Sequence, residues 1–181
     1  MILPFTPTWT KVDALPEGFE RFDYLFDKDV EKEWKKGYDG LNEGRKTAVR
    51  FRWLIRELNN GGLEQYFWNF TGGYTAETIQ DLRTIGHEPA SIILRDASEK
   101  LFGESDAPPE TGLRRAAIEA SYGTHPFNDD DDAERLATLR GKEDLTNETR
   151  ALRAHQQQIV VAMVNWMRAN AAHFTHIRGL G

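Results

Sequence analysis

The stretch that decides the fold lies near the middle of the chain, where residues 60–73 read Asn60-Gly61-Gly62-Leu63-Glu64-Gln65-Tyr66-Phe67-Trp68-Asn69-Phe70-Thr71-Gly72-Gly73. A glycine pair stands near each end of this stretch, and glycine tolerates the left-handed conformation that ends a helix. Between the pairs, apolar residues are spaced i, i+3, i+4 and i+7, at Leu63, Tyr66, Phe67 and Phe70. This period predicts a short helix over 63–70 that packs on several of its sides.

Helical periods continue on both sides of this stretch. Towards the N-terminus, apolar residues recur at steps of three and four over 17–36 and again over 44–58. Towards the C-terminus, the same pattern predicts helices over 75–86, 89–102, 110–121 and 147–172. A further helix is expected to carry Leu136 and Leu139. Loops are expected over 104–109 and 122–131.

The order of these elements predicts the fold class and the domain limits. No stretch alternates apolar and polar residues over enough positions for a sheet, so we expect an all-α fold: a single compact domain of seven to nine helices. This domain spans 17–173. Residues 1–16 contain Pro4, Pro7 and Pro16 and are expected to form an extended N-terminal arm, pinned by apolar side chains that include Trp9. Residues 174–181 are expected to form a C-terminal tail that frays.

Composition restricts the class of protein. The chain has 181 residues, 39% of them hydrophobic, so it can bury a core without disulfide bonds or structural metal ions. It has no Cys for disulfides or thiolate sites. No apolar run approaches the ~18 residues of a membrane span, and the N-terminus does not resemble a secretory signal. We therefore expect no membrane contact and a cytoplasmic location.

The charge balance argues against direct binding of nucleic acid. The net charge is −6, and residues 61–120 hold ten acidic residues against five basic ones. A phosphate-backbone binder needs a basic face. The aromatic residues around Trp68 also lack the interleaved Lys and Arg of a single-strand binder, because residues 61–82 contain neither. We therefore assign these aromatic residues to the core.

The search for catalytic and metal-binding patterns selects no site. His87-Glu88 begins like a zinc-protease motif, but Ser91 stands where the second His is required, so His87 is expected to be a loop or capping residue. His173 and His176 alone make a weak metal site. His125 precedes a proline in a loop, and no carboxylate pair stands out as catalytic. We predict no catalytic residues, no metal and no cofactor, and the sequence leaves open whether the protein is an enzyme.

The central block carries a resemblance to a known family. Residues Asn60 to Asn69, followed by Gly72, Glu77-Thr78, Leu82 and Ile85-Gly86, resemble the core motif of the DNA mimic protein 19 family, a bacterial family of otherwise unknown function. The resemblance covers about residues 40–121. It implies an all-helical dimer without an assigned enzymatic activity. It also implies an acidic surface that imitates duplex DNA and occupies the DNA-binding face of a transcriptional regulator.

On this interpretation the partner is a basic DNA-binding protein, because carboxylates held on helices can replace phosphates against Lys and Arg. The expected partner-binding acidic face comprises Glu77, Asp81, Glu88, Asp96, Glu99, Glu104, Asp106, Glu110, Asp129, Asp130, Asp131 and Asp132. The motif residues are expected to be structural: glycines for turns, Asn and Gln for backbone hydrogen bonds, aromatic rings for the core. These are Asn60, Gly61, Gly62, Gln65, Tyr66, Phe67, Trp68, Asn69 and Gly86.

Three alternatives stay open at this stage. The protein could be an immunity-type inhibitor of a basic nuclease, or a module that only dimerises. It could also be a small-molecule binder or an uncharacterised enzyme with a pocket near residues 60–69. In that case Asn60, Glu64, Gln65 and Asn69 would converge on a ligand amid aromatic rings. The competing interpretation is that these polar side chains cap neighbouring helices.

Overall fold

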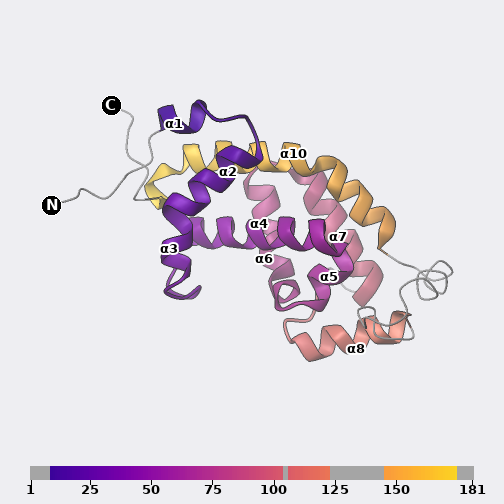
Figure 1. The fold of residues 1–181 in the computed structure, drawn as a ribbon. Coiled ribbons are helices and arrows are strands. Elements are labelled where there is room, and N and C mark those ends of the chain that lie inside the picture. The colour runs from indigo at the N-terminus through magenta and orange to yellow at the C-terminus, as the bar shows by residue number, and fades with distance from the viewer. Residues whose placement is uncertain (1–8, 104–105, 123–144, 175–181) are drawn as a thin grey trace.

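The computed structural model describes residues 9–103, 106–122 and 145–174, and these ranges are helical throughout apart from connecting loops (Figure 1). No strand occurs in them, so the predicted all-α fold class is confirmed. The α-helices are α1 (Trp9–Asp13), α2 (Phe19–Leu25), α3 (Glu31–Trp34), α4 (Glu43–Asn60), α5 (Gly62–Trp68), α6 (Thr75–Thr84), α7 (Glu88–Phe102), α8 (Thr111–Tyr122) and α10 (Thr146–Ala169). A π-helical segment (Phe26–Val30) joins α2 to α3, and 3-10 segments cover Phe70–Tyr74 and Ala171–His173.

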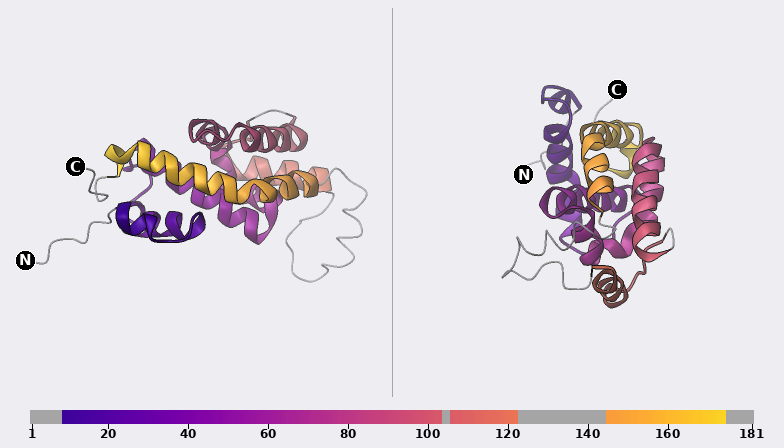
Figure 2. Two further views of the ribbon diagram at one scale, coloured as in Figure 1. Left: turned by 90° about the horizontal axis from the view of Figure 1, so that it is seen from above. Right: turned by 90° about the vertical axis from the view of Figure 1, so that its right-hand side faces the viewer.

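The long helices α4 and α10 form the axis of the molecule (Figures 1 and 2). Helices α1 to α3 lie at the end of the body where α10 finishes, while α5 and α8 lie towards the other end (Figure 1). Helices α6 and α7 form a hairpin that packs against both long helices. Helix α1 also meets the end of α10. The guanidinium of Arg168 in α10 pairs with Asp13, and its Cζ lies 4.6 Å from the centre of the Trp9 ring.

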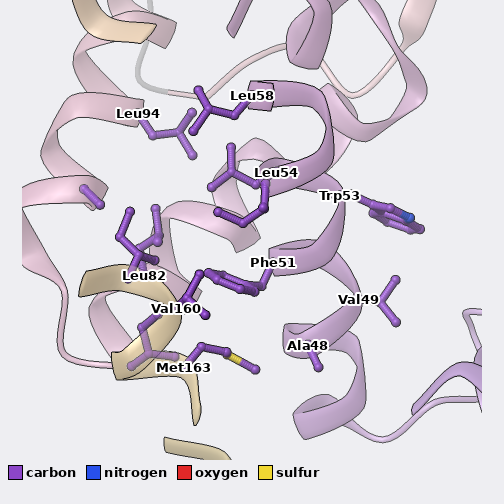
Figure 3. Packing of buried hydrophobic residues seen from close by; sticks show 14 of the residues in the cluster. Ala48, Val49, Phe51, Trp53, Leu54, Leu58, Leu82, Leu94, Val160 and Met163 are labelled. Atoms are coloured by element: carbon purple, nitrogen blue, oxygen red, sulfur yellow. The ribbon is translucent and has the colours of Figure 1, made fainter. Parts of the chain in front are cut away.

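The core forms where α4 faces α6, α7 and α10 (Figure 3). Phe51, Leu54 and Leu58 of α4 point towards Leu82 of α6 and Leu94 of α7, and all five side chains are buried. Val160 and Met163 of α10 close the same cluster. Helix α4 is buried on several faces, because its apolar positions extend beyond a single stripe. Helix α4 is therefore the central helix, against which α5, α6 and α10 pack.

The N-terminal helical segment contains a wide turn that the sequence period explains. From Phe22 its inward residues follow at three successive steps of four, through Phe26 and Val30 to Trp34. An ordinary helix advances 3.6 residues per turn, so three steps of four rotate the stripe away from the core. The π-helical segment Phe26–Val30 widens the turn and keeps Phe22, Phe26 and Val30 buried.

Helix ends follow the sequence signals closely. Pro89 lies in the first turn of α7, where its missing N–H has no intrahelical partner in any case. Gly86 and Gly103 have φ of 86° and 75°, the left-handed conformation that ends a helix. His87 caps α7, since its Nδ1 accepts a hydrogen bond from the Ala90 N–H at 3.2 Å. The expected capping role of His87 is confirmed.

The structure differs from the expected domain limits in two places. Residues Trp9–Asp13 of the expected extended arm form a helical turn, because Trp9 and Val12 are spaced i, i+3 and are both buried. The sequence analysis placed Phe174 in the fraying tail, but its side chain is fully buried, and its ring centre lies 6.1 Å from that of Trp166. Residues 1–8 of the expected arm and residues 175–181 of the expected tail lie outside the described residues. The helix expected at Leu136 and Leu139 and the part of the expected loop after Tyr122 lie outside them too.

Candidate functional site

The polar residues of the central motif hold helices together. Nε2 of Gln65 and Nδ2 of Asn69 both donate to Oε2 of Glu57, at 2.6 Å and 2.8 Å. Glu64 Oε1 accepts the backbone N–H of Leu145, at the start of α10. The expectation that these amides would bond to the backbone is wrong, because their donors meet a carboxylate of α4 instead. Gln65 and Asn69 therefore tie α5 to α4 and do not converge on a ligand.

A buried arginine closes the C-terminal end of α5. Arg114 is 0% exposed, and its guanidinium donates to the carbonyl oxygens of Phe67 and Asn69, each at 2.9 Å. It also donates to the Pro108 and Pro109 carbonyls, each at 2.7 Å. Carbonyls at a helix end carry partial negative charge, which favours a cation there. Burial lowers the pKa of Arg114 from its ordinary value, as expected for a cation held by neutral dipoles.

The next residue also turns towards α5. The Arg115 guanidinium lies 4.9 Å from the Trp68 ring centre, and its Nε donates to the Trp68 carbonyl at 3.2 Å. By sequence, Arg114 and Arg115 follow directly after the acidic residues of 77–110. In the structure, Arg114 is buried and Arg115 stacks on the Trp68 indole. Of the two, only Arg115 presents its charge to solvent.

Close packing explains the second glycine pair of the motif. A Cβ atom at Gly72 would lie 2.7 Å from the Phe67 Cα and 2.8 Å from the Phe67 carbonyl oxygen, which is closer than real Cβ atoms approach. A Cβ at Gly73 would lie 2.8 Å from the Pro109 carbonyl oxygen. The segment Phe70–Tyr74 therefore passes between α5 and the loop before α8 only if both positions lack a side chain. The aromatic residues Tyr66, Phe67 and Trp68 are buried, as predicted.

Asp81 belongs to the interior and not to an exposed face. Its two carboxylate oxygens accept bonds from Arg50 at 2.5 Å and 2.9 Å, and from the Thr47 hydroxyl at 2.7 Å. Arg50 also donates to the Tyr38 hydroxyl at 2.8 Å. The carboxylate raises the pKa of Arg50 despite the opposing effect of burial, and burial raises the pKa of Tyr38 to about 12. Asp81 therefore secures α6 against α4, with its negative charge balanced by Arg50.

Five other predicted carboxylates lie in the first turn of α6, in the second half of α7 and in the loop before α8. Because α6 and α7 form a hairpin, the beginning of α6 and the end of α7 share an end (Figure 1). The loop that follows α7 returns to the same place, since the Pro109 carbonyl packs on Gly73 just before α6. We call this region the acidic end; its carboxylates are Glu77, Asp96, Glu99, Asp106 and Glu110, and each of these residues is exposed.

The acidic end keeps an excess of negative charge. Arg95 lies 3.0 Å from Asp96 and 3.6 Å from Glu99, so one guanidinium serves two carboxylates. Among the described residues, Glu77, Asp106 and Glu110 take part in no ion pair. Lys100, the other nearby base on α7, pairs with Glu148 of α10 at 3.2 Å. Exposed carboxylates that form no ion pair among the described residues can meet an external cation.

The remaining predicted acidic residues lie elsewhere. Glu88 is at the opposite end of α7, where its carboxylate is 3.5 Å from Arg83. Glu104 and Asp129 to Asp132 lie outside the described residues. An open groove of about 610 Å³ adjoins Glu77, between the start of α4, α6 and the end of α10, with the Trp166 ring on its wall. Glu77 and Glu43 lie at its edge, and Glu43 pairs with Lys46 at 3.0 Å.

The histidines of the described residues do not belong to a cluster that could hold a metal ion. The His87 ring is 5.3 Å from His155, and burial, followed by the neighbouring His155 charge, lowers the pKa of His87. His173 packs against Gly44. No group of three or more His, Asp or Glu side chains suited to a metal ion occurs in the residues described, and His125 and His176 lie outside them. None of the described helices is long and apolar enough to cross a bilayer.

These features define an all-helical protein in which three exposed carboxylates, Glu77, Asp106 and Glu110, form no ion pair among the described residues. Residues 39–170 match the family model described as DMP19-like protein, and the chain belongs to this family. The match confirms the resemblance seen in the central motif and extends it through α10. No curated protein and no solved structure matches the chain.

Proposed function

We propose that this protein binds a basic DNA-binding protein, such as a transcriptional regulator, and competes with DNA for it. The observation that carries the proposal is membership of the DMP19-like family over residues 39–170. The acidic end supports it, since Glu77, Asp106 and Glu110 are exposed and have no ion pair among the described residues. A surface that meets DNA presents Lys and Arg, which these carboxylates would engage in place of phosphates.

The rigidity of the acidic end also supports this function. A duplex presents phosphates at fixed spacing, so a protein that replaces it must hold its carboxylates still. Buried contacts hold this region: Arg50 and Thr47 fasten α6 through Asp81, and Arg114 fastens the loop before α8 to α5. These contacts order the backbone of the segments on folding, which lowers the entropic cost of binding.

A competition experiment tests the proposal. The tagged protein is incubated with bacterial lysate at about 50 mM and about 500 mM salt, because charge-led binding weakens with screening. We expect a DNA-binding protein to be captured at low salt only and to be released by added duplex DNA. Recovery of no DNA-binding protein at low salt, or recovery that duplex DNA does not reduce, would overturn the proposal.

A pair of variants locates the surface. Glu99→Gln with Glu110→Gln removes two charges from the acidic end, and Glu17→Gln with Glu20→Gln removes two exposed charges near α2. The two double variants have the same net charge. We expect the first to lose capture and the second to retain it. Equal loss in both would show that overall charge, and not the acidic end, drives the association.

Two further expectations belong to this proposal. We place the protein in the cytoplasm, where a DNA-binding partner would be available, and we propose a homodimer, which the family resemblance implies. Light scattering after size exclusion should then report twice the chain mass of 20.7 kDa. A mass of one chain at all tested concentrations would remove the dimer from the proposal and leave the partner unaffected.

A further inference from the structure

A second groove lies on the N-terminal side of the molecule, between the α2–α3 segment and α4. Its volume is about 490 Å³. Aromatic rings line it: Phe22 and Phe26 from the α2 side, and Trp34 and Trp53, whose ring centres are 6.2 Å apart. The negative faces of such rings attract cations, and a cation is bound more strongly where water is partly excluded. The floor of this groove therefore suits a flat cationic group.

Carboxylates line the same groove. Asp23, Asp27 and Glu31 follow one another at steps of four, so they project from the same side of the α2–α3 segment, and all three line the groove. The α4 side contributes the guanidinium groups of Arg52 and Arg56. Three carboxylates thus face two internal cations, which leaves the lining with a negative charge.

The groove already holds a guanidinium in the manner that an external one would use. Arg52 pairs with Asp23, and its Cζ lies 5.2 Å from the Phe26 ring centre. The contact combines a carboxylate with an aromatic face, the two interactions that a guanidinium favours. Asp23 is thereby occupied. The next carboxylate along the segment has no equivalent partner.

That next carboxylate is Asp27. Among the described residues it takes part in no ion pair, although Arg52 and Lys28 lie near it. Partial burial, followed by the charges of Glu31 and Asp23, raises the pKa of Asp27 above its ordinary value. Glu31 pairs with Lys35, but that lysine is 68% exposed and does not line the groove, so the pair is a weak surface one. A further cation in the groove would be stabilised by both carboxylates.

We propose that this groove binds the guanidinium side chain of an arginine in a partner protein, between Asp27 and Glu31 and against the partly buried ring of Trp34, which lies beside the buried Trp53. The site goes beyond the proposed function, because α2 and α3 precede residues 39–170, the part of the chain that matches the family. It does not involve the acidic end. An arginine is favoured over other partners because its planar cation matches both the carboxylates and the ring faces.

The groove is fixed in place before any ligand arrives. Asp29, in the π-helical segment, is fully buried, and its carboxylate accepts from Nε and Nη2 of Arg45 at 3.0 Å and 3.2 Å. This two-point ion pair joins the segment to α4. Asp27, two residues earlier, is exposed, so its replacement changes the groove without removing this anchor.

Peptide binding tests the inference directly. The probe is a fluorescent, acetylated and amidated peptide of sequence Gly-Arg-Gly-Arg-Gly, and the matched probe carries citrulline, the uncharged isostere, in place of each arginine. We expect Asp27→Asn to weaken binding of the arginine peptide by about tenfold, the equivalent of 1.4 kcal/mol. We expect Asp96→Asn, the same change at the acidic end, to alter it by less than about twofold. Equal affinity of the two peptides for the unaltered protein would overturn the inference.

The indole N–H signals in NMR spectra locate the bound peptide. Signals of Trp34 and Trp53 should shift on addition of the arginine peptide, while that of Trp166, in the groove beside Glu77, should not. The double variant Glu99→Gln with Glu110→Gln should bind this peptide normally, which separates the present site from the proposed function. Loss of peptide binding in that double variant, with full binding by Asp27→Asn, would place the cation at the acidic end and refute the groove.

Discussion

Replacement of Arg114 by Met should strongly destabilise the protein, although this arginine forms no ion pair with a carboxylate of the described residues. Methionine keeps much of the apolar stem but removes every donor of the guanidinium. The Phe67 carbonyl is buried and loses a donor, which costs about 1–3 kcal/mol. The part-buried carbonyls of Asn69, Pro108 and Pro109 can bond to water instead and cost about 0.5–1.5 kcal/mol each. We expect a loss of about 3–5 kcal/mol in the free energy of unfolding, since these contributions are not fully additive.

The neighbouring residue provides the matched control. Arg115 is exposed and makes one bond to a carbonyl and one stacking contact with Trp68, so Arg115→Met should cost only about 1 kcal/mol. Arg114→Lys keeps the charge but loses the planar fork that reaches several carbonyls at once, and should recover less than half of the lost stability. Urea unfolding followed by tryptophan fluorescence measures all three variants. Equal destabilisation by Arg114→Met and Arg115→Met, or full recovery by Lys, would refute the reasoning.

Three further predictions concern the interior and its glycines. Asp81→Asn should lower the free energy of unfolding by about 3–5 kcal/mol in urea, because Arg50 would remain buried without a carboxylate, and an unchanged midpoint would contradict this role. His87 has a lowered pKa, so its contribution to stability is complete above about pH 6.5 and is lost as the pH falls through the folded-state pKa; His87→Asn, which keeps a cap acceptor, should reduce the drop in melting temperature between about pH 7.5 and 5. Gly72→Ala should destabilise the protein, although helical backbone usually favours Ala over Gly by about 1 kcal/mol, because the added Cβ would meet the Phe67 backbone; a variant as stable as the parent in thermal unfolding would contradict that packing.

Most helices could be predicted from the sequence because their signals are local. The apolar period of α4, the proline of α7 and the glycines that end α6 and α7 each act within a few residues, and the structure confirms all of them. The prediction of an extended arm is wrong at Trp9–Asp13 for a related reason. A single helical turn is too short to show a period, and it forms here because the body buries Trp9 and Val12.

The acidic face could be predicted only in part. Sequence reasoning included Asp81 because it lies one turn from Glu77, a spacing that indicates a shared helix side. It could not reveal that Arg50, 31 residues earlier, would enclose that carboxylate. It also passed over Asp27 and Glu31, which lie among charge-balanced residues in the sequence but face an aromatic groove in the structure.

The sequence alone determined an all-helical chain, the position of most helices, the family to which the central motif belongs and the excess of acidic residues in the middle third. Only the tertiary structure decided which charges remain available to a partner. Arg114 reaches carbonyls 45 and 47 residues away, whereas Glu77, Asp106 and Glu110 form no ion pair among the described residues. Helix signals are short-range, whereas the burial and pairing of a charge depend on which distant segments the fold brings against it.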